Sequence, residues 1–132
     1  MTTPRTIYIA GPMTPKGQRA DAPNPAIEYA MNLKDMIDAA NALIDKGYAP
    51  YCPALDFQYF LTRSGRPMSE AQIKAVSMAF LEACDCACFI PRWEHSVGCN
   101  EEYGRAVELE MPLFFGVENV PDLSAGEVED AR

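Results

Sequence analysis

Two adjacent glutamates, Glu101 and Glu102, stand in the segment C-N-E-E-Y-G-R-A at residues 99–106, where the pattern predicts a helix. Neighbours on a helix point about 100° apart, so one carboxylate can face solvent while the other faces a pocket. Glu101 lies four residues before Arg105, with which it would form an exposed ion pair. The other glutamate belongs to an inward stripe with spacings of three and four, formed by Cys99, Glu102, Ala106 and Leu109. We therefore expect Glu102 to face a pocket.

Gly104 lies inside the same predicted helix, where glycine is about 1 kcal/mol less favourable than alanine. Close approach of a ligand, or of the strand expected at residues 6–10, would account for it. Glu102 also has a purely structural interpretation, as a partly buried acid satisfied by hydrogen bonds such as one from Tyr8.

A candidate anion site precedes this helix, in the segment R-W-E-H-S-V-G-C at residues 92–99. Ser96 is suited to cap the helix, and Gly98 falls in its first turn, where free backbone N–H groups can hold an anion. The alternative is a capped helix and nothing more. The loop G-P-M-T-P-K-G at residues 11–17 would converge on the same edge, because ligands of open parallel sheets bind beyond the carboxyl ends of the strands.

Five cysteines are present, an odd number with no C-x-x-C pair. In C-D-C-A-C the alternation predicts that Cys84, Cys86 and Cys88 share one face of a strand, as reduced cysteines used as small apolar residues. A metal site built from them with His95 and Cys99 is conceivable, but C-x-C-x-C in a strand is not the spacing of a tetrahedral zinc site. We expect no metal.

The remaining elements alternate between strands and helices. The pattern predicts strands at 6–10, 48–53, 84–91 and 111–117, and helices at 25–46, from Ser69 to about 83, and at 97–110. In the first helix the inward positions would be Ile27, Ala30, Leu33, Ile37, Ala40 and Ile44. In the second they would be Ile73, Val76, Phe80 and either Cys84 or Ala83, with Ser77 inside the same stripe. Prolines suggest that strand 48–53 lies at an edge. This order predicts an α/β protein, a flavodoxin-like or Rossmann-like three-layer sandwich with an open parallel sheet of four or five strands.

Composition narrows the class of partner. With 132 residues the chain is the size of one domain, which we expect at residues 1–117, followed by an acidic C-terminal tail at 118–132 that contributes to the net charge of −8. No block of Lys and Arg could neutralise a phosphate backbone, so we expect no nucleic-acid polymer as partner. Neither a membrane span nor a secretory signal is recognisable, which predicts no membrane partner and a cytoplasmic protein.

Four segments together resemble the nucleoside 2-deoxyribosyltransferase-like superfamily, over about residues 6–117. They are I-Y-I-A-G-P-M, C-D-x-x-x-F-I, W-x-x-S-x-G-x-x-x-E-x-G-x-A and a final x-P-L strand. The superfamily includes deoxyribosyltransferases, deoxynucleoside monophosphate N-glycosidases and small bacterial and phage proteins of unassigned function.

The resemblance implies roles for individual residues. Glu102 matches the nucleophilic glutamate and Tyr8 the tyrosine that orients it. Ser96 matches the serine that holds a 5′-phosphate, with Gly98 and the helix N-terminus. Met13 matches a position that packs on the base, and Gly11 belongs to the same binding loop.

One position departs from the family pattern. Ser77 stands where the family usually has an aspartate that contacts the base or sugar and assists departure of the base, and serine is no general acid near neutral pH. Asp56 and His95 are candidates to replace it. Otherwise the catalytic function is weakened or absent.

By this resemblance the protein would be an N-glycosidase that cleaves a (deoxy)nucleoside 5′-monophosphate to release free base, without a cofactor. Base transfer by a deoxyribosyltransferase is the close variant. A nucleotide-binding or sensing module without turnover is the alternative from another class, and a purely structural domain is a third. A small-molecule nucleoside or nucleotide would be its partner, and a homo-oligomer is implied.

Overall fold

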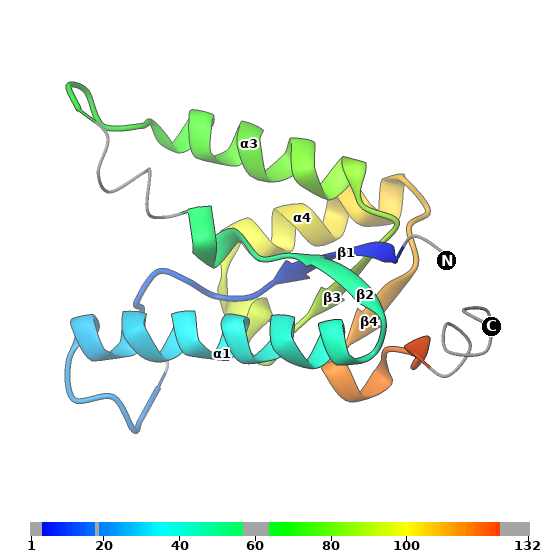
Figure 1. The fold of residues 1–132 in the computed structure, drawn as a ribbon. Coiled ribbons are helices and arrows are strands. Elements are labelled where there is room, and N and C mark those ends of the chain that lie inside the picture. The colour runs from blue at the N-terminus through cyan, green and yellow to red at the C-terminus, as the bar shows by residue number, and fades with distance from the viewer. Residues whose placement is uncertain (1–3, 18, 57–63, 125–132) are drawn as a thin grey trace.

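The computed structural model describes residues 4–17, 19–56 and 64–124, which form a four-stranded parallel sheet with helices on both faces (Figure 1). Along the sheet the strand order is β2-β1-β3-β4. The predicted α/β class with an open parallel sheet is thus confirmed, and β2 lies at an edge as its prolines suggested. The principal elements in chain order are β1 (Arg5–Ala10), α1 (Pro25–Asp45), β2 (Tyr48–Tyr51), α3 (Glu70–Ala83), β3 (Cys86–Phe89), α4 (Val97–Glu108) and β4 (Leu113–Phe115).

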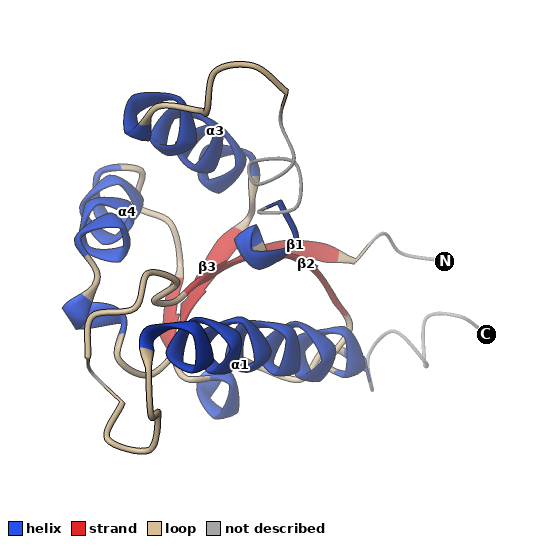
Figure 2. Ribbon diagram, turned by 90° about the vertical axis from the view of Figure 1, so that its left-hand side faces the viewer, coloured by secondary structure: helices blue, strands red, loops and turns tan. Residues whose placement is uncertain are grey.

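The central strand β1 divides the core into two layers. Ile7 and Ile9 pack against α1, whereas Tyr8 and Ala10 face the side of α3 and α4, as the alternation of a strand requires. Figure 2 shows α1 on one face of the sheet and both other helices on the opposite face. Tyr8 therefore points into the layer that also holds α4.

The buried face of α1 differs from the predicted one. Ile27 and Ile44, two of the positions expected to face inward, are 43% and 55% exposed. The buried positions are instead Glu28, Asn32, Met36, Ala39 and Leu43. Two of these are polar, and Glu28 accepts hydrogen bonds from the backbone N–H groups of Lys16 and Gly17 at 2.9 and 3.0 Å. Apolar periodicity missed this face because the helix uses polar side chains there to hold the loop that follows β1.

The start of α3 agrees with the prediction, since Ser69 caps the helix and forms a capping box with Gln72. Its inward stripe is only partly buried in this chain. Leu81 is the buried residue of the helix, whereas Phe80 is 44% exposed and stacks on Tyr51 with ring centroids 4.3 Å apart. Ile73, Val76 and Ser77 are partly buried.

Strand β3 is shorter at both ends than the predicted 84–91, since it runs from Cys86 to Phe89. Cys84 is the C-cap of α3 rather than a strand residue. It packs in the layer of α3 and α4, whereas Cys86 and Cys88 belong to the α1 layer, so the three cysteines do not share one face. None of the five cysteines forms a disulfide.

The segment after β4 packs on the domain. Val120 is 2% exposed within the α1 layer of the core. Lys46 donates from Nζ to the carbonyl oxygens of Val117 and Val120, at 2.8 Å each, and Tyr48 donates to that of Pro121 at 2.9 Å. The beginning of the expected tail 118–132 is thus part of the folded body, and residues 125–132 lie outside the described part. Over the described ranges, no helix has both the length and the apolar character needed to cross a membrane.

Candidate functional site

The side chains of Tyr8 and Glu102 meet between β1 and α4. The Tyr8 hydroxyl donates a hydrogen bond to Oε2 of Glu102. Tyr8 is fully buried, and its ring lies on that of Tyr51 with centroids 5.6 Å apart and planes 24° apart. Since both the strand and the stacked ring fix Tyr8, its hydroxyl is a positioned donor for the carboxylate.

The site changes the proton affinity of both groups. Burial raises the pKa of Glu102 to about 7, the neighbouring charge of Glu101 adds to this, and the hydrogen bond from Tyr8 acts in the opposite direction. Burial and the charge of Glu102 raise the pKa of Tyr8, so Tyr8 keeps its proton at neutral pH. A hydrogen bond with Ser77 on α3 lowers the pKa of Tyr8 against these effects. Glu102 can therefore switch between acid and carboxylate near neutral pH, with Tyr8 as a permanent donor.

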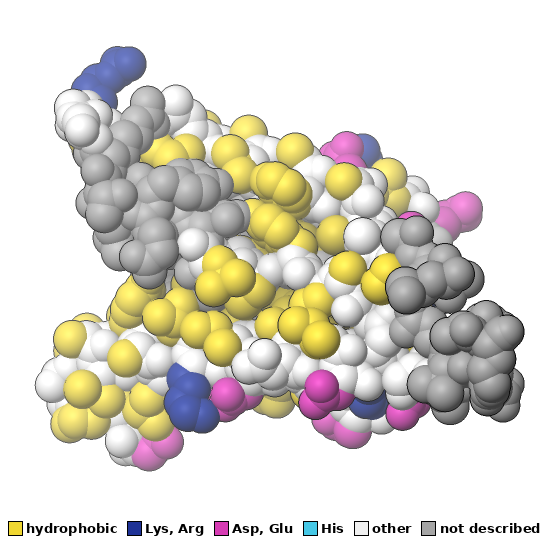
Figure 3. Space-filling view, viewed as in Figure 1, with side chains coloured by type: hydrophobic (Ala, Val, Ile, Leu, Met, Phe, Trp, Pro, Cys, Tyr) yellow, Lys and Arg dark blue, Asp and Glu magenta, His cyan; other side chains and the backbone are white. Residues whose placement is uncertain are grey.

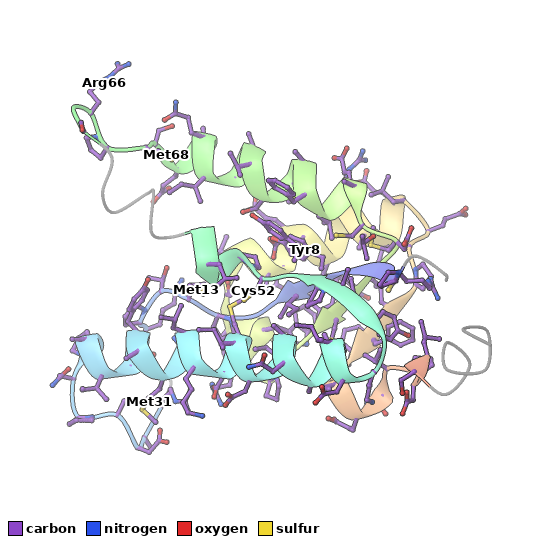
Figure 4. All side chains as sticks on the ribbon, viewed as in Figure 1. Tyr8, Met13, Met31, Cys52, Arg66 and Met68 are labelled. Atoms are coloured by element: carbon purple, nitrogen blue, oxygen red, sulfur yellow. The ribbon has the colours of Figure 1, made fainter. Side chains whose placement is uncertain are left out.

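The Tyr8–Glu102 pair lines a small cavity of about 190 Å³, here called the inner pocket. Its described lining combines a few polar groups with an apolar wall that includes Met36, Pro53 and Ile73. Tyr8 and Met13, both labelled in Figure 4, reach it from β1 and from the loop that follows this strand. Seven of the eight predicted site residues line the inner pocket: Tyr8, Gly11, Met13, Ser77, Ser96, Gly98 and Glu102. The eighth, Asp56, ends a short 3₁₀ helix (Pro53–Asp56), and its side chain lies outside what the structure describes.

A second cavity of about 560 Å³, the outer cleft, shares Thr14, Ile73, Ser96 and Gly98 with the inner pocket. The N-terminus of α4 lies at this boundary. Ser96 caps the helix by accepting from the backbone N–H of Cys99 at 3.2 Å. A Cβ placed on Gly98 would approach the Ser96 hydroxyl oxygen at 3.8 Å, which is ordinary van der Waals contact, so the backbone there is open to a ligand. The two cavities are therefore neighbours, and the N-terminus of α4 lies where they meet.

His95 lies in the outer cleft and is exposed. It is not part of the inner pocket lining. Of the two residues expected to replace the missing aspartate, the one that the structure describes therefore does not reach the cavity of Glu102.

Arg92 is a site residue that the sequence analysis missed. Its backbone is left-handed with φ of 73°, an uncommon conformation for arginine, and it lines the outer cleft. Its Nη2 donates to Asp35 of α1 at 2.7 Å, while Arg19 donates to the same carboxylate oxygen at 2.6 Å. Its buried Nε has no hydrogen-bond partner among the residues that the structure describes. No motif marks Arg92, because both its backbone strain and its contact with Asp35 depend on tertiary structure.

The surroundings of Gly11 and Gly104 differ. A Cβ on Gly11 would lie 2.6 Å from side-chain atoms of Ile90, so glycine here allows β1 to end against a packed isoleucine. Gly104 has no described neighbour within 4 Å of such a Cβ and borders an open groove between α3 and α4. The close approach expected at Gly104 is therefore not found among the described residues.

The predicted Glu101–Arg105 pair is replaced by two ion pairs between helices. Glu101 binds Lys74 of α3, and Nε of Arg105 lies 3.0 Å from Glu82 of the same helix. The separation of the two glutamates still holds, because Glu101 is exposed and Glu102 is partly buried. In the described part of the chain, no group of three His, Cys, Asp or Glu side chains is arranged to hold a metal ion.

Comparison with known proteins identifies a family for this chain. A sequence profile described as "Domain of unknown function (DUF4406)" matches residues 5–115, which contain all four strands and both predicted catalytic residues. No curated protein matches the chain.

Proposed function

The chain belongs to the DUF4406 family, and since that family's description assigns no activity, we propose a function from the site itself: an N-glycosidase that cleaves a nucleoside 5′-monophosphate. The observation that carries this proposal is the hydrogen bond from the buried Tyr8 to Glu102 in a pocket that opens on a helix N-terminus. The motif resemblance to the nucleoside 2-deoxyribosyltransferase-like superfamily supports it independently.

The reaction uses Glu102 as the nucleophile. Its carboxylate attacks the anomeric carbon as the bond to the base breaks, and water then cleaves the glycosyl ester. Tyr8 fixes the carboxylate and favours its ionised form. Ser77, through its hydrogen bond with Tyr8, positions that donor.

The phosphate binds at the start of α4. Ser96 offers a hydroxyl, and the first turn, with Gly98, offers free N–H groups and the positive end of the helix dipole. In this proposal the base and sugar occupy the inner pocket, and the phosphate lies at its boundary with the outer cleft. Gly11 and Met13 contact the sugar and base.

The test is release of free base. Incubation with a panel of ribo- and deoxyribonucleoside monophosphates should give one or more free bases on chromatography, and Glu102→Gln should lower the rate by about 1,000-fold or more. Glu108→Gln is the matched control, since this glutamate lies on the same helix outside both cavities. Equal rates for wild type and Glu102→Gln would refute the proposed nucleophile.

A nucleotide-binding module without turnover is the second candidate, favoured by serine at position 77. It predicts that a nucleotide raises the melting temperature and yet stays intact over a long incubation. Base exchange, the deoxyribosyltransferase variant, predicts that a second free base is incorporated into the nucleotide.

We also propose a homo-oligomer in a reducing, cytoplasmic setting. Phe80 and Leu55 are exposed, at 44% and 62%, and Figure 3 shows hydrophobic side chains gathered between α3 and α1. Five cysteines without a disulfide suit a compartment that keeps thiols reduced. Light scattering on the purified protein tests the assembly.

A further inference from the structure

The inner pocket has an acidic side chain in its described lining and no basic one. Its described lining contains the carboxylate of Glu102 but no Lys, Arg or His. The rest of the wall is largely apolar, with side chains such as Ile9, Met36 and Ile73. Ionisation of Glu102 in this setting is opposed by burial and by Glu101, and only the Tyr8 hydrogen bond favours it. A cation in the pocket would stabilise the carboxylate that the reaction needs.

The described lining of the inner pocket has few groups that could protonate a departing base. Tyr8 already donates to Glu102, and its pKa is raised. Burial raises the pKa of the Cys99 thiol to about 12. The remaining protic groups in the described lining are the hydroxyls of Thr14, Ser77 and Ser96, which are not acids near neutral pH. A base that departs without needing a proton fits this chemistry.

The helix start beside the inner pocket has the complementary character. The N-terminus of α4 faces the outer cleft at Ser96, Val97 and Gly98, where its free N–H groups favour an anion. Lys16 and Arg92 line the same cleft together with the carboxylates of Glu28, Glu70 and Glu101, so the helix N-terminus is the part of the cleft that favours a phosphate. The two adjacent cavities therefore suit a ligand with a cation at the Glu102 end and a phosphate at the start of α4.

We propose that the substrate is an N-ribosylpyridinium mononucleotide, whose base is itself the cation. This inference rests on the proposed function and names the substrate class of the same site. The bond between C1′ and the pyridinium nitrogen breaks, and its electron pair returns to the nitrogen, so the base leaves as a neutral pyridine. A Glu102 oxygen forms the bond to C1′. Water then attacks C1′, the carboxylate is released, and the sum is pyridine, ribose 5-phosphate and one proton.

The experiment compares nicotinamide mononucleotide with the monophosphates of adenosine, guanosine, cytidine and uridine and their deoxy counterparts. Free base is quantified by chromatography, and proton release is followed in weak buffer. We expect nicotinamide release at least about 100-fold faster than release of any neutral base, because the missing general acid would be needed only for the latter. One proton should appear per nicotinamide, and Glu102→Gln should abolish both signals.

Ser77→Asp provides a second readout, because it restores an acid beside Tyr8. It should raise cleavage of neutral-base nucleotides relative to nicotinamide mononucleotide by about tenfold or more. Cleavage of a neutral-base nucleotide as fast as nicotinamide mononucleotide, or faster, would overturn the pyridinium inference and leave the proposed glycosidase standing. Release of no base from any nucleotide would overturn both.

Discussion

The hydroxyl of Tyr8 and the carboxylate of Glu102 act as one unit, so a change in either alters the other. In Tyr8→Phe the ring can keep its stacking on Tyr51, but the carboxylate loses the hydrogen bond that favours its charged form. We expect kcat/KM at pH 7 to fall by about 10- to 100-fold, and the midpoint of the pH–rate profile to move above its wild-type value near pH 7. Tyr51→Phe is the matched control. An unshifted profile in Tyr8→Phe would contradict the assigned role.

The raised pKa of Glu102 also predicts how stability depends on pH. The ordinary pKa of 4.5 applies to the unfolded chain and a pKa of about 7 to the folded one, so between these values the folded state holds a proton that the unfolded state has lost. This contribution to the free energy of unfolding is fully present below pH 4.5 and is lost as pH rises to about 7.

Glu102→Gln removes this titration. Its free energy of unfolding, measured in urea, should therefore rise relative to wild type by about 3 kcal/mol at most between pH 4 and pH 8. Taking the difference between the two proteins cancels the titration of other groups. A difference that stays constant with pH would mean that the folded pKa of Glu102 is ordinary.

Individual site residues differed in how visible they were in the sequence. Glu102 stood out because a carboxylate interrupted an otherwise apolar helical stripe, and Ser96 because it matched a helix cap. Arg92 could not be recognised from the sequence. Its left-handed backbone follows from no local motif, and its partner Asp35 is far away in the chain.

The role of Ser96 in capping α4 can be tested separately from its proposed role in binding a phosphate. Aspartate caps helices about as well as serine, so Ser96→Asp should change the free energy of unfolding by less than about 0.5 kcal/mol. The added negative charge should nevertheless weaken binding of a nucleoside monophosphate by about tenfold or more, measured by calorimetry. The matching nucleoside without phosphate should bind Ser96→Asp as it binds wild type. Unchanged affinity for the monophosphate would exclude the phosphate from this helix end.

Helix existence and order were predictable because the apolar spacing, the caps and the terminal glycine and prolines agreed with one another. Which face of α1 is buried could not be predicted. Its buried face includes Glu28 and Asn32, and a polar side chain gives no apolar signal even when the fold satisfies it internally. For the same reason the position of the loop at 11–17, which Glu28 holds, could not be read from periodicity.

The folded body extends past the last strand. Val120 is buried against the α1 layer, so Val120→Ala should lower the free energy of unfolding by about 2 kcal/mol in a urea titration. Val107 is 50% exposed on α4, so Val107→Ala should change the free energy of unfolding by less than about 0.5 kcal/mol. Equal effects of the two substitutions would indicate that Val120 is not part of the core in solution.

The sheet topology followed from the alternation of strands and helices, whereas the end of the domain did not follow from composition. Acidic residues after Gly116 suggested a tail, although a single apolar side chain and the hydrogen bonds from Lys46 are enough to bind the segment to the domain. Composition averages over such local contacts.

Tyr8 and Glu102 are 94 positions apart, and the chain completes most of its sheet between them. A chain cut between β2 and α3 would carry the donor on one piece and the carboxylate on the other. Neither fragment could make the hydrogen bond alone, and turnover would appear only when the two halves reassemble around β1 and β3. If Tyr8 and Glu102 act as proposed, turnover would therefore also report, without an added label, whether two halves of this domain have assembled.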